Sequence, residues 1–288
     1  IALERNFGIW TVDTASGQAR GVPIVRRGAA AASAPERTRQ TNQFEDLALS
    51  PDGRKVAFIA RGDVFAASAK DEGDAARVTA TADLESQPAW APDSRRLAFV
   101  RAQQIVLYDF QSGAESALTS GAATDLSPVF SPDGKRIAFL RDRKTLHVLD
   151  LESRQDRVLA TGTFADTIDE PKPVWSPDGQ WIALFAIGTK AFTNVSLVSL
   201  TDNAPPRPVS FLANVYAHTI AWSRDGTYLL FDTGQRTEDG RLARVDLTLR
   251  TPRFREDLFK DLFTSPESPK SPKGPESPNP SNPSNPSN

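Results

Sequence analysis

The chain has 288 residues, 39% of them hydrophobic and 24% charged, which is typical of a globular protein. A formal net charge of −2 and the lack of a basic stripe argue against nucleic acids and anionic membranes as main partners. The absence of cysteine excludes disulfides, thiol catalysis and thiolate metal sites, and the longest apolar run, residues 182–187, is too short to span a bilayer. Methionine is also absent, so we expect a processed chain or a segment of a longer one.

The first thirteen residues repeat a pattern that returns further along the chain. Residues 1–13 (IALERNFGIWTVD) align without a gap with residues 97–109 (LAFVRAQQIVLYD). The alignment predicts two strands in each segment. Residues 26–43, which follow, show no apolar periodicity, so we expect a long loop there.

A four-residue turn phrase then recurs five times. The copies begin at residues 50, 91, 131, 176 and 223, and four of the five carry Pro-Asp in second and third place. Proline presets φ for a turn, aspartate accepts backbone N–H bonds, and the glycine that usually follows supplies a positive φ. Each phrase is therefore predicted to be a corner between two strands. A large apolar residue precedes every copy: Leu49, Trp90, Phe130, Trp175 and Trp222.

The spacing of the phrases, 41, 40, 45 and 47 residues, matches one blade of a β-propeller. A β-rich run follows each phrase, and a third strand follows that run. We predict an all-β fold, a six-bladed β-propeller over residues 1–250, with the four aromatic rings before the phrases buried between blades. Six third strands are expected, ending at Asp13, Ser68, Asp109, Asp150, Ser199 and Asp246.

The first blade is predicted to be incomplete. The alignment of residues 1–13 places Ile1 where a second blade strand begins, so the inner strand of this blade is not in the chain. An open sheet edge is a template for pairing with another segment. A second copy is the favoured donor, although simple truncation of a longer chain explains the same gap. The expected assembly edge is Ile1, Ala2, Leu3, Glu4 and Arg5.

Two further segments follow the propeller. Apolar residues recur every four positions in residues 251–263, which predicts a short helix that either caps the propeller or docks on another domain. In residues 264–288 proline recurs at every third position, which predicts an extended, solvated tail. A linker, a peptide for another chain and an O-glycosylated segment are all compatible with this tail.

Acidic residues occupy similar positions in successive blades, at the end of each blade that is expected to border the central channel of the propeller. One of the two histidines lies near the start of an innermost strand, close to the mouth of this channel. Such residues could form a ring that binds a cation or an amine group. Solvated loop charges and a structural histidine are the alternatives. The candidate binding residues are Glu45, Glu85, Asp125, Glu170 and His218, with Asp46 and Asp169 beside them.

No common catalytic motif is present. The sequence lacks HExxH, P-loop, GxGxxG and GxSxG patterns, so the usual zincin, nucleotide-binding and elbow-nucleophile mechanisms have no signature. We therefore expect no enzyme activity from this chain, no metal site and no cofactor.

The W/F-S-P-D-G phrase followed by an I-A-F-type strand resembles the TolB-like, WD-like propeller repeat over about residues 1–250. Residues 7–17, 41–53, 211–226 and 251–263 resemble the propeller portion of tricorn-type secreted peptidases. In that family propellers precede a PDZ module and a serine-protease domain and admit or filter peptides. None of the catalytic domain lies in this chain, so the resemblance carries over no catalytic residue.

These observations favour a non-catalytic, periplasmic or extracellular propeller that binds a protein or peptide and self-assembles through its open first blade. Two alternatives stay open. One is the substrate-gating propeller of a tricorn-type peptidase whose catalytic domain is absent from this chain. The other is a structural subunit of an extracellular fibre.

Overall fold

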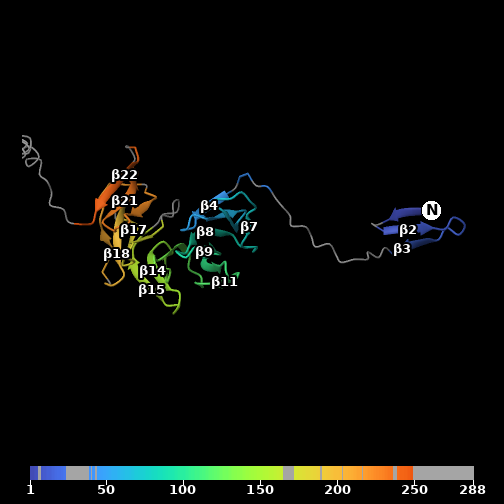
Figure 1. Ribbon diagram of the computed structural model, residues 1–288, viewed down its shortest axis with the longest axis horizontal. Coiled ribbons are helices and arrows are strands. Elements are labelled where there is room, and N and C mark those ends of the chain that lie inside the picture. Colours follow the sequence, from blue (N-terminus) through green and yellow to red (C-terminus); the bar gives the residue numbers. More distant parts are fainter. Residues whose placement is uncertain are drawn as a thin grey trace, which may run out of the picture. The chain divides into compact units, whose positions relative to one another are not determined.

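The computed structural model describes residues 1–5, 8–23, 39, 41–42, 44–164, 172–188, 190–202, 204–215, 217–235 and 239–248. Every regular element in these residues is a β-strand, and the strands form six antiparallel sheets (Figure 1). The chain divides into two compact units, residues 1–43 and residues 44–288.

The first unit is a three-stranded sheet. Its strands are β1 (Ala2–Arg5), β2 (Gly8–Val12) and β3 (Ala19–Val22), in that order, so β1 is an edge strand. Leu3 pairs with Trp10 just as Phe99 pairs with Val106, which is the register that the alignment of the two segments requires. The predicted strand pair at residues 1–13 is thus confirmed.

The second unit contains four four-stranded sheets and one three-stranded sheet, and within each sheet the strands neighbour each other in chain order. Each first strand runs up to a turn phrase. The strands are β4 (Phe44–Leu49), β5 (Lys55–Ala60), β6 (Asp63–Ser68), β7 (Ala76–Arg77); β8 (Glu85–Trp90), β9 (Arg96–Arg101), β10 (Gln104–Asp109), β11 (Ala114–Ala117); β12 (Asp125–Phe130), β13 (Arg136–Arg141), β14 (Thr145–Asp150), β15 (Asp156–Thr161); β16 (Val174–Trp175), β17 (Trp181–Ile187), β18 (Thr193–Ser199), β19 (Arg207–Pro208); and β20 (Ile220–Trp222), β21 (Tyr228–Thr233), β22 (Arg241–Asp246).

The six sheets confirm the predicted all-β propeller pattern. Third strands end as expected at Ser68, Asp109, Asp150, Ser199 and Asp246. In the first unit the corresponding strand is β2, which ends at Val12, one residue before the expected Asp13. The predicted helix over residues 251–263, the tail over residues 264–288 and most of the loop over residues 26–43 lie outside the described residues.

The turn phrases owe their shape to a serine hydroxyl. In the copy at residue 131, Ser131 Oγ donates to Asp133 at 2.5 Å and accepts the N–H of Arg136 at 3.0 Å, while Gly134 has a φ of 67°. The copies at residues 50 and 176 repeat these bonds. In the copy at residue 91, Ser94 replaces the glycine with a φ of 56°, and its hydroxyl accepts the N–H of Asp52 from the preceding sheet.

These turns make the stability of the protein depend on pH. The hydroxyls of Ser131 and Ser176 hold the pKa values of Asp133 and Asp178 below the ordinary 3.8. A lowered folded-state pKa contributes stability above the unfolded value, and that contribution is lost as the pH falls through the folded value. We expect the double variant Ser131→Ala/Ser176→Ala to have a lower melting temperature than the wild type at pH 7, with the difference shrinking as the pH drops from 4 to 2.

Thermal unfolding by circular dichroism at pH 7, 4, 3 and 2 measures this difference. Ser120→Ala, at an exposed serine, serves as the control and should match the wild type at each pH. A difference that stays constant down to pH 2 would show that the serines act only through packing.

Aromatic residues join neighbouring sheets. Trp90, Phe130 and Trp175 are only 8%, 7% and 6% exposed, which confirms their predicted burial, while Trp222 is half-buried. The indole N–H groups of the three tryptophans each donate to a backbone carbonyl in the first strand of the preceding sheet, at 3.0–3.1 Å. The pairs are Trp90 with Ala48, Trp175 with Val129, and Trp222 with Val174. The same contact therefore recurs three times around the second unit, and it fixes how one sheet packs on the next.

Candidate functional site

The first strands of three sheets share a β-bulge. The register shifts between Glu45 and Ala48 in β4, and at the equivalent places in β8 and β12. At each bulge one residue adopts a left-handed backbone, with φ of 49° at Asp46 and 55° at Gln87 and Ser127. Bulges in edge strands often redirect a side chain. All three residues lie four positions before a turn phrase.

The bulge residues are linked to each other across the sheets. Asp46 accepts the backbone N–H of Gln87 through Oδ2 at 2.7 Å, and Gln87 accepts the backbone N–H of Ser127 through Oε1 at 2.6 Å. We name this chain of side-chain-to-backbone bonds the bulge ladder. It shows that β4, β8 and β12 adjoin at this level, and it compensates for the cost of three left-handed residues that are not glycine.

Lys172 holds the equivalent position in the next sheet, four residues before Ser176. Its side chain is exposed, but surrounding protein desolvates the ammonium and lowers its pKa below the ordinary 10.5. The charge of Asp46 acts in the opposite direction.

Two of the predicted binding residues are buried ion pairs. Glu85, with a fully buried side chain, accepts Arg101 Nε at 2.8 Å and the hydroxyl of Thr81 at 2.7 Å. Asp125 accepts Arg141 through two bonds of 2.7 and 3.0 Å. The arginines also bind Glu115 and Asp156 further out in their own sheets. Arginine thus occupies both carboxylates.

The carboxylates raise the pKa values of both arginines. The bonds that Arg101 donates to Glu115 raise its pKa, and the bonds to Asp125 raise that of Arg141. Asp156 also binds His147, which is 5% exposed and stacks on Phe139, so this histidine is packed within its sheet. Each cluster binds strands of a single sheet together.

The remaining predicted residues lie in different surroundings. Glu45 is exposed at the bulge of β4, and Glu170 lies outside the described residues. The acidic ring as a whole stays a prediction. Sequence reasoning passed over Gln87, Ser127 and Lys172. The signal that could have found them is the constant offset of four residues before each phrase.

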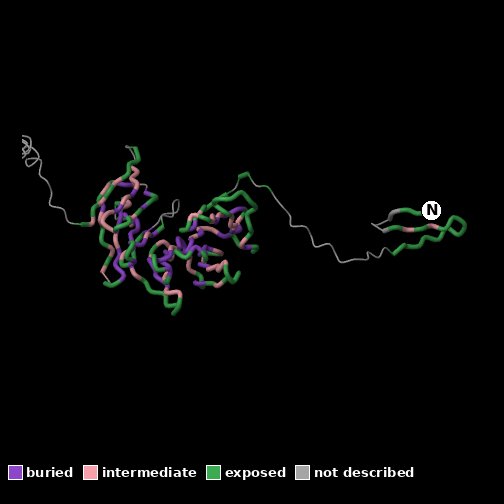
Figure 2. The backbone as a smooth tube through the Cα atoms, viewed as in Figure 1, coloured by how far each residue is buried: buried purple, intermediate pink, exposed green. Residues whose placement is uncertain are grey.

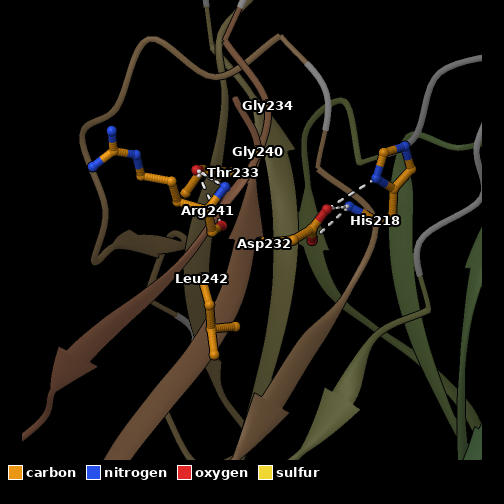
Figure 3. Close-up of a pocket in the computed structure, with 7 residues that line it drawn as sticks. All are labelled: His218, Asp232, Thr233, Gly234, Gly240, Arg241 and Leu242. Carbon is orange, nitrogen blue, oxygen red and sulfur yellow. Dashed lines mark hydrogen bonds and ion pairs between the residues drawn. The ribbon is translucent and has the colours of Figure 1, made fainter. Parts of the chain in front are cut away.

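His218 lines a pocket of about 430 Å³ beside the last sheet, with Asp232, Thr233, Gly234, Gly240, Arg241 and Leu242 (Figure 3). Its Nδ1 lies 2.9 Å from Asp232 Oδ2, and the backbone N–H groups of His218 and Thr219 also bind this carboxylate. Burial raises the pKa of Asp232, but these hydrogen bonds outweigh it and the net pKa is lowered. The carboxylate therefore orients the imidazole ring.

The pocket opens on a sheet face that is covered in the other sheets. Leu242 lies in the third strand of its sheet and pairs with Asp232. The residues at the same position in the four preceding sheets pair with apolar partners, and they are Val64, Ile105, Leu146 and Val195. Those four residues are 0% exposed because the following sheet covers them, whereas Leu242 is 71% exposed. We name this surface of β21 and β22 the Leu242 face.

The first sheet of the second unit has an uncovered face on its other side. Leu49 stands in the position of the buried aromatic rings, but it is 59% exposed. Nearby, Phe44 packs edge-on against Phe58, which stacks on Phe65. Phe58 is partly exposed, while its equivalent Phe99 is fully buried. Figure 2 shows the exposed stretch of β4, and we name this surface the Leu49 face.

Solved structures share this fold. The tricorn protease gives a TM-score of 0.56 at 13% identity and covers 88% of this chain and 26% of its own. TolB from Acinetobacter baumannii gives 0.52 at 19% identity over 71% of this chain, and this chain spans about half of that TolB, 50% of its length. The hydrazine synthase of Kuenenia stuttgartiensis gives 0.53 at 15% identity, covering 78% of this chain and 70% of that one. At such identities the likeness concerns the fold alone.

The comparison with curated proteins gives no significant match. Among the described residues no helix is long and apolar enough to cross a membrane. The family model of the TolB β-propeller domain (PD40) matches residues 75–261, which is more than half of the chain. The predicted kinship with TolB and with the tricorn propeller is thereby confirmed, and the chain belongs to the TolB β-propeller domain family.

Proposed function

We propose that the chain is a non-catalytic protein-binding and assembly propeller that works in the periplasm or outside the cell. Membership of the TolB β-propeller domain family supports a role in protein interaction and a periplasmic location. The ion pairs of Glu85 and Asp125 fit a structural role for the acidic residues better than a catalytic one.

One observation carries the proposal: within residues 44–288 the first and the last sheet each have a face that no other sheet of this range covers. On the Leu49 face a residue 59% exposed holds a position that is 6–8% exposed in the next three sheets. On the Leu242 face a residue 71% exposed holds a position that is fully buried in the four preceding sheets. Exposed apolar surface of this kind marks protein interaction sites.

The partner that fits such a face is a β-sheet with apolar side chains. The sheet β1–β3 presents such side chains, because Ile1, Leu3 and Ile9 are 76%, 40% and 45% exposed. Covering these exposed apolar side chains with another apolar face removes them from water, which is favourable. We infer that β1–β3 of one copy covers an exposed face of another copy, with the edge strand β1 available for strand pairing.

Size-exclusion chromatography with light scattering tests this assembly over a hundredfold range of concentration. The wild type should associate beyond the 31.3 kDa monomer. Leu49→Asp or Leu242→Asp should raise the concentration needed for association at least tenfold, because a carboxylate is costly to bury. Leu84→Asp, at a leucine that is 76% exposed and directly precedes β8, is the matched control. A wild type that stays monomeric at all concentrations contradicts self-assembly.

Substrate gating in a tricorn-type peptidase is a second candidate, and it rests on the resemblance of four segments of this chain, among them residues 41–53 and 211–226, to the propeller portion of that family. This function requires protease modules in the same native polypeptide. The intact mass of the native protein, with its terminal sequences, measures this directly. A native protein without additional modules contradicts the gating function and leaves the assembly proposal standing.

A further inference from the structure

Consecutive sheets of residues 44–288 pack on each other in one common direction. Four hydrophobic clusters each join one sheet to the next. In every cluster a third-strand residue of one sheet meets a second-strand residue of the following sheet, as Ile105 meets Phe139. We call the side of a sheet that carries residues such as Ile105 its front face, and the side that carries residues such as Phe139 its back face. All four contacts are therefore front to back.

The Leu242 face is the front face of the last sheet. Leu242 is 71% exposed at a position where a following sheet buries the residue in the other four sheets. Its neighbour on this face, Asp232, already accepts the backbone N–H groups of His218 and Thr219, so a cover leaves that carboxylate with its partners. The surface that fits the Leu242 face is consequently the back face of another sheet.

The register of β1–β3 assigns a front and a back face to this sheet as well. Leu3 pairs with Trp10 as Phe99 pairs with Val106, so Leu3 and Trp10 stand at back-face positions. Ile9 stands at the position of Ile105, because side chains alternate between the two faces of a strand. We name the back face the Leu3 face and the front face the Ile9 face. Ile1 shares the Leu3 face, and Val22 pairs with Ile9 on the other side.

Two back faces are exposed, the Leu3 face and the Leu49 face, and burial favours the Leu3 face as the cover. None of the described residues of β1–β3 is buried, and none belongs to a hydrophobic cluster. The sheet β4–β7 already has its front-face residues Ile59 and Val64 buried against the next sheet. Because burial is favourable in proportion to the apolar area covered, β1–β3 gains more from a contact than β4–β7 does.

We propose that the Leu242 face binds the Leu3 face of the sheet β1–β3 from a second copy of this chain. The inference rests on the proposed self-assembly and names the two surfaces that meet. The same front-to-back rule pairs the Ile9 face with the Leu49 face. Such a contact is heterologous, because the two surfaces differ, so assembly continues until a ring closes or a filament forms.

Disulfide trapping between two single-cysteine variants of the full chain tests this contact, because the chain has no cysteine of its own. Leu3→Cys and Leu242→Cys are mixed and oxidised, and the cross-linked dimer is followed by non-reducing gel electrophoresis and mass spectrometry of its disulfide-linked peptides. We expect this pair to cross-link at least tenfold faster than three control mixtures. The controls are Ile9→Cys with Leu242→Cys, Leu3→Cys with Leu49→Cys, and Leu49→Cys with Leu242→Cys. All four positions are 40–71% exposed, so each thiol is accessible.

The outcomes separate this inference from the proposed self-assembly. If the wild type associates but Leu3→Cys links no faster than Ile9→Cys, the pairing of faces is wrong and self-assembly stands. Fastest linkage of Leu49→Cys to Leu242→Cys shows that residues 44–288 stack directly, which also overturns the inference. If the double variant Leu3→Cys/Leu242→Cys closes a disulfide within the monomer while the mixture stays unlinked, the cover does not come from a second copy.

A charge pair provides a second measurement that needs no cysteine. Leu242→Asp weakens association, and adding Leu3→Lys to the same chain should restore it at least about fivefold, because opposite charges then meet across the contact. Adding Ile9→Lys to Leu242→Asp is the matched control and should restore nothing. Light scattering over the same concentration range measures both double variants, and equal rescue by the two lysines contradicts the assignment of faces.

Discussion

Replacing Trp175 with alanine should lower the free energy of unfolding by about 3–5 kcal/mol, the usual cost of truncating a buried aromatic residue. Trp175 is 6% exposed and packs between the third and fourth sheets of residues 44–288, against Leu126, Ala138 and Leu140. Its indole N–H also donates to the carbonyl of Val129 at 3.1 Å. Urea unfolding followed by tryptophan fluorescence and circular dichroism measures the loss.

Trp175→Phe separates the ring from its hydrogen bond. Phe130 holds the same position in the preceding sheet without an indole N–H, so this position accepts phenylalanine. The phenylalanine variant should therefore lose about 1–2 kcal/mol, because one carbonyl loses its donor and some ring area is removed. An alanine variant that loses less than about 1 kcal/mol would show that the ring does not hold the two sheets together.

Removing the carboxylate of Asp125 should cost about 3–5 kcal/mol, because Arg141 then keeps a partly buried charge without its main partner. The side chain of Asp125 is 1% exposed and makes two bonds to the guanidinium. The control is Asp202→Ala, which removes an exposed ion pair. In the wild type the side chains of Asp202 and Arg207 in this pair are 44% and 57% exposed. The exposed pair should be worth less than about 1 kcal/mol.

The double variant Asp125→Leu/Arg141→Met distinguishes the ion pair from simple packing. Apolar side chains of similar volume often replace a buried ion pair at little cost. We expect this variant to unfold at a higher urea concentration than Asp125→Ala. An Asp125→Ala variant as stable as Asp202→Ala would mean that solvent, and not Arg141, balances the charge of Asp125.

The sequence by itself determined the repeat. A turn phrase such as Ser131-Pro132-Asp133-Gly134 depends on bonds between residues a few positions apart, so its shape can be predicted without the rest of the chain. The constant offset from each phrase then predicted the strands, the aromatic positions at Trp90, Phe130 and Trp175, and the pairing of residues 1–13. These features are local or periodic, and the family membership follows from them.

Only the tertiary structure decided what surrounds each charge and each exposed leucine. Glu85 and Asp125 resemble open ligands in the sequence, but the register of neighbouring strands places each opposite an arginine, so the pair is neutralised inside its sheet. The bulge ladder depends on hydrogen bonds between strands of different sheets, and its bonded residues are 41 and 40 positions apart in the chain. Leu49 and Leu242 follow the same pattern as their buried equivalents, and only the absence of a neighbouring sheet within residues 44–288 leaves them exposed. Periodicity predicts which face of a strand is apolar, whereas burial depends on what packs against that face.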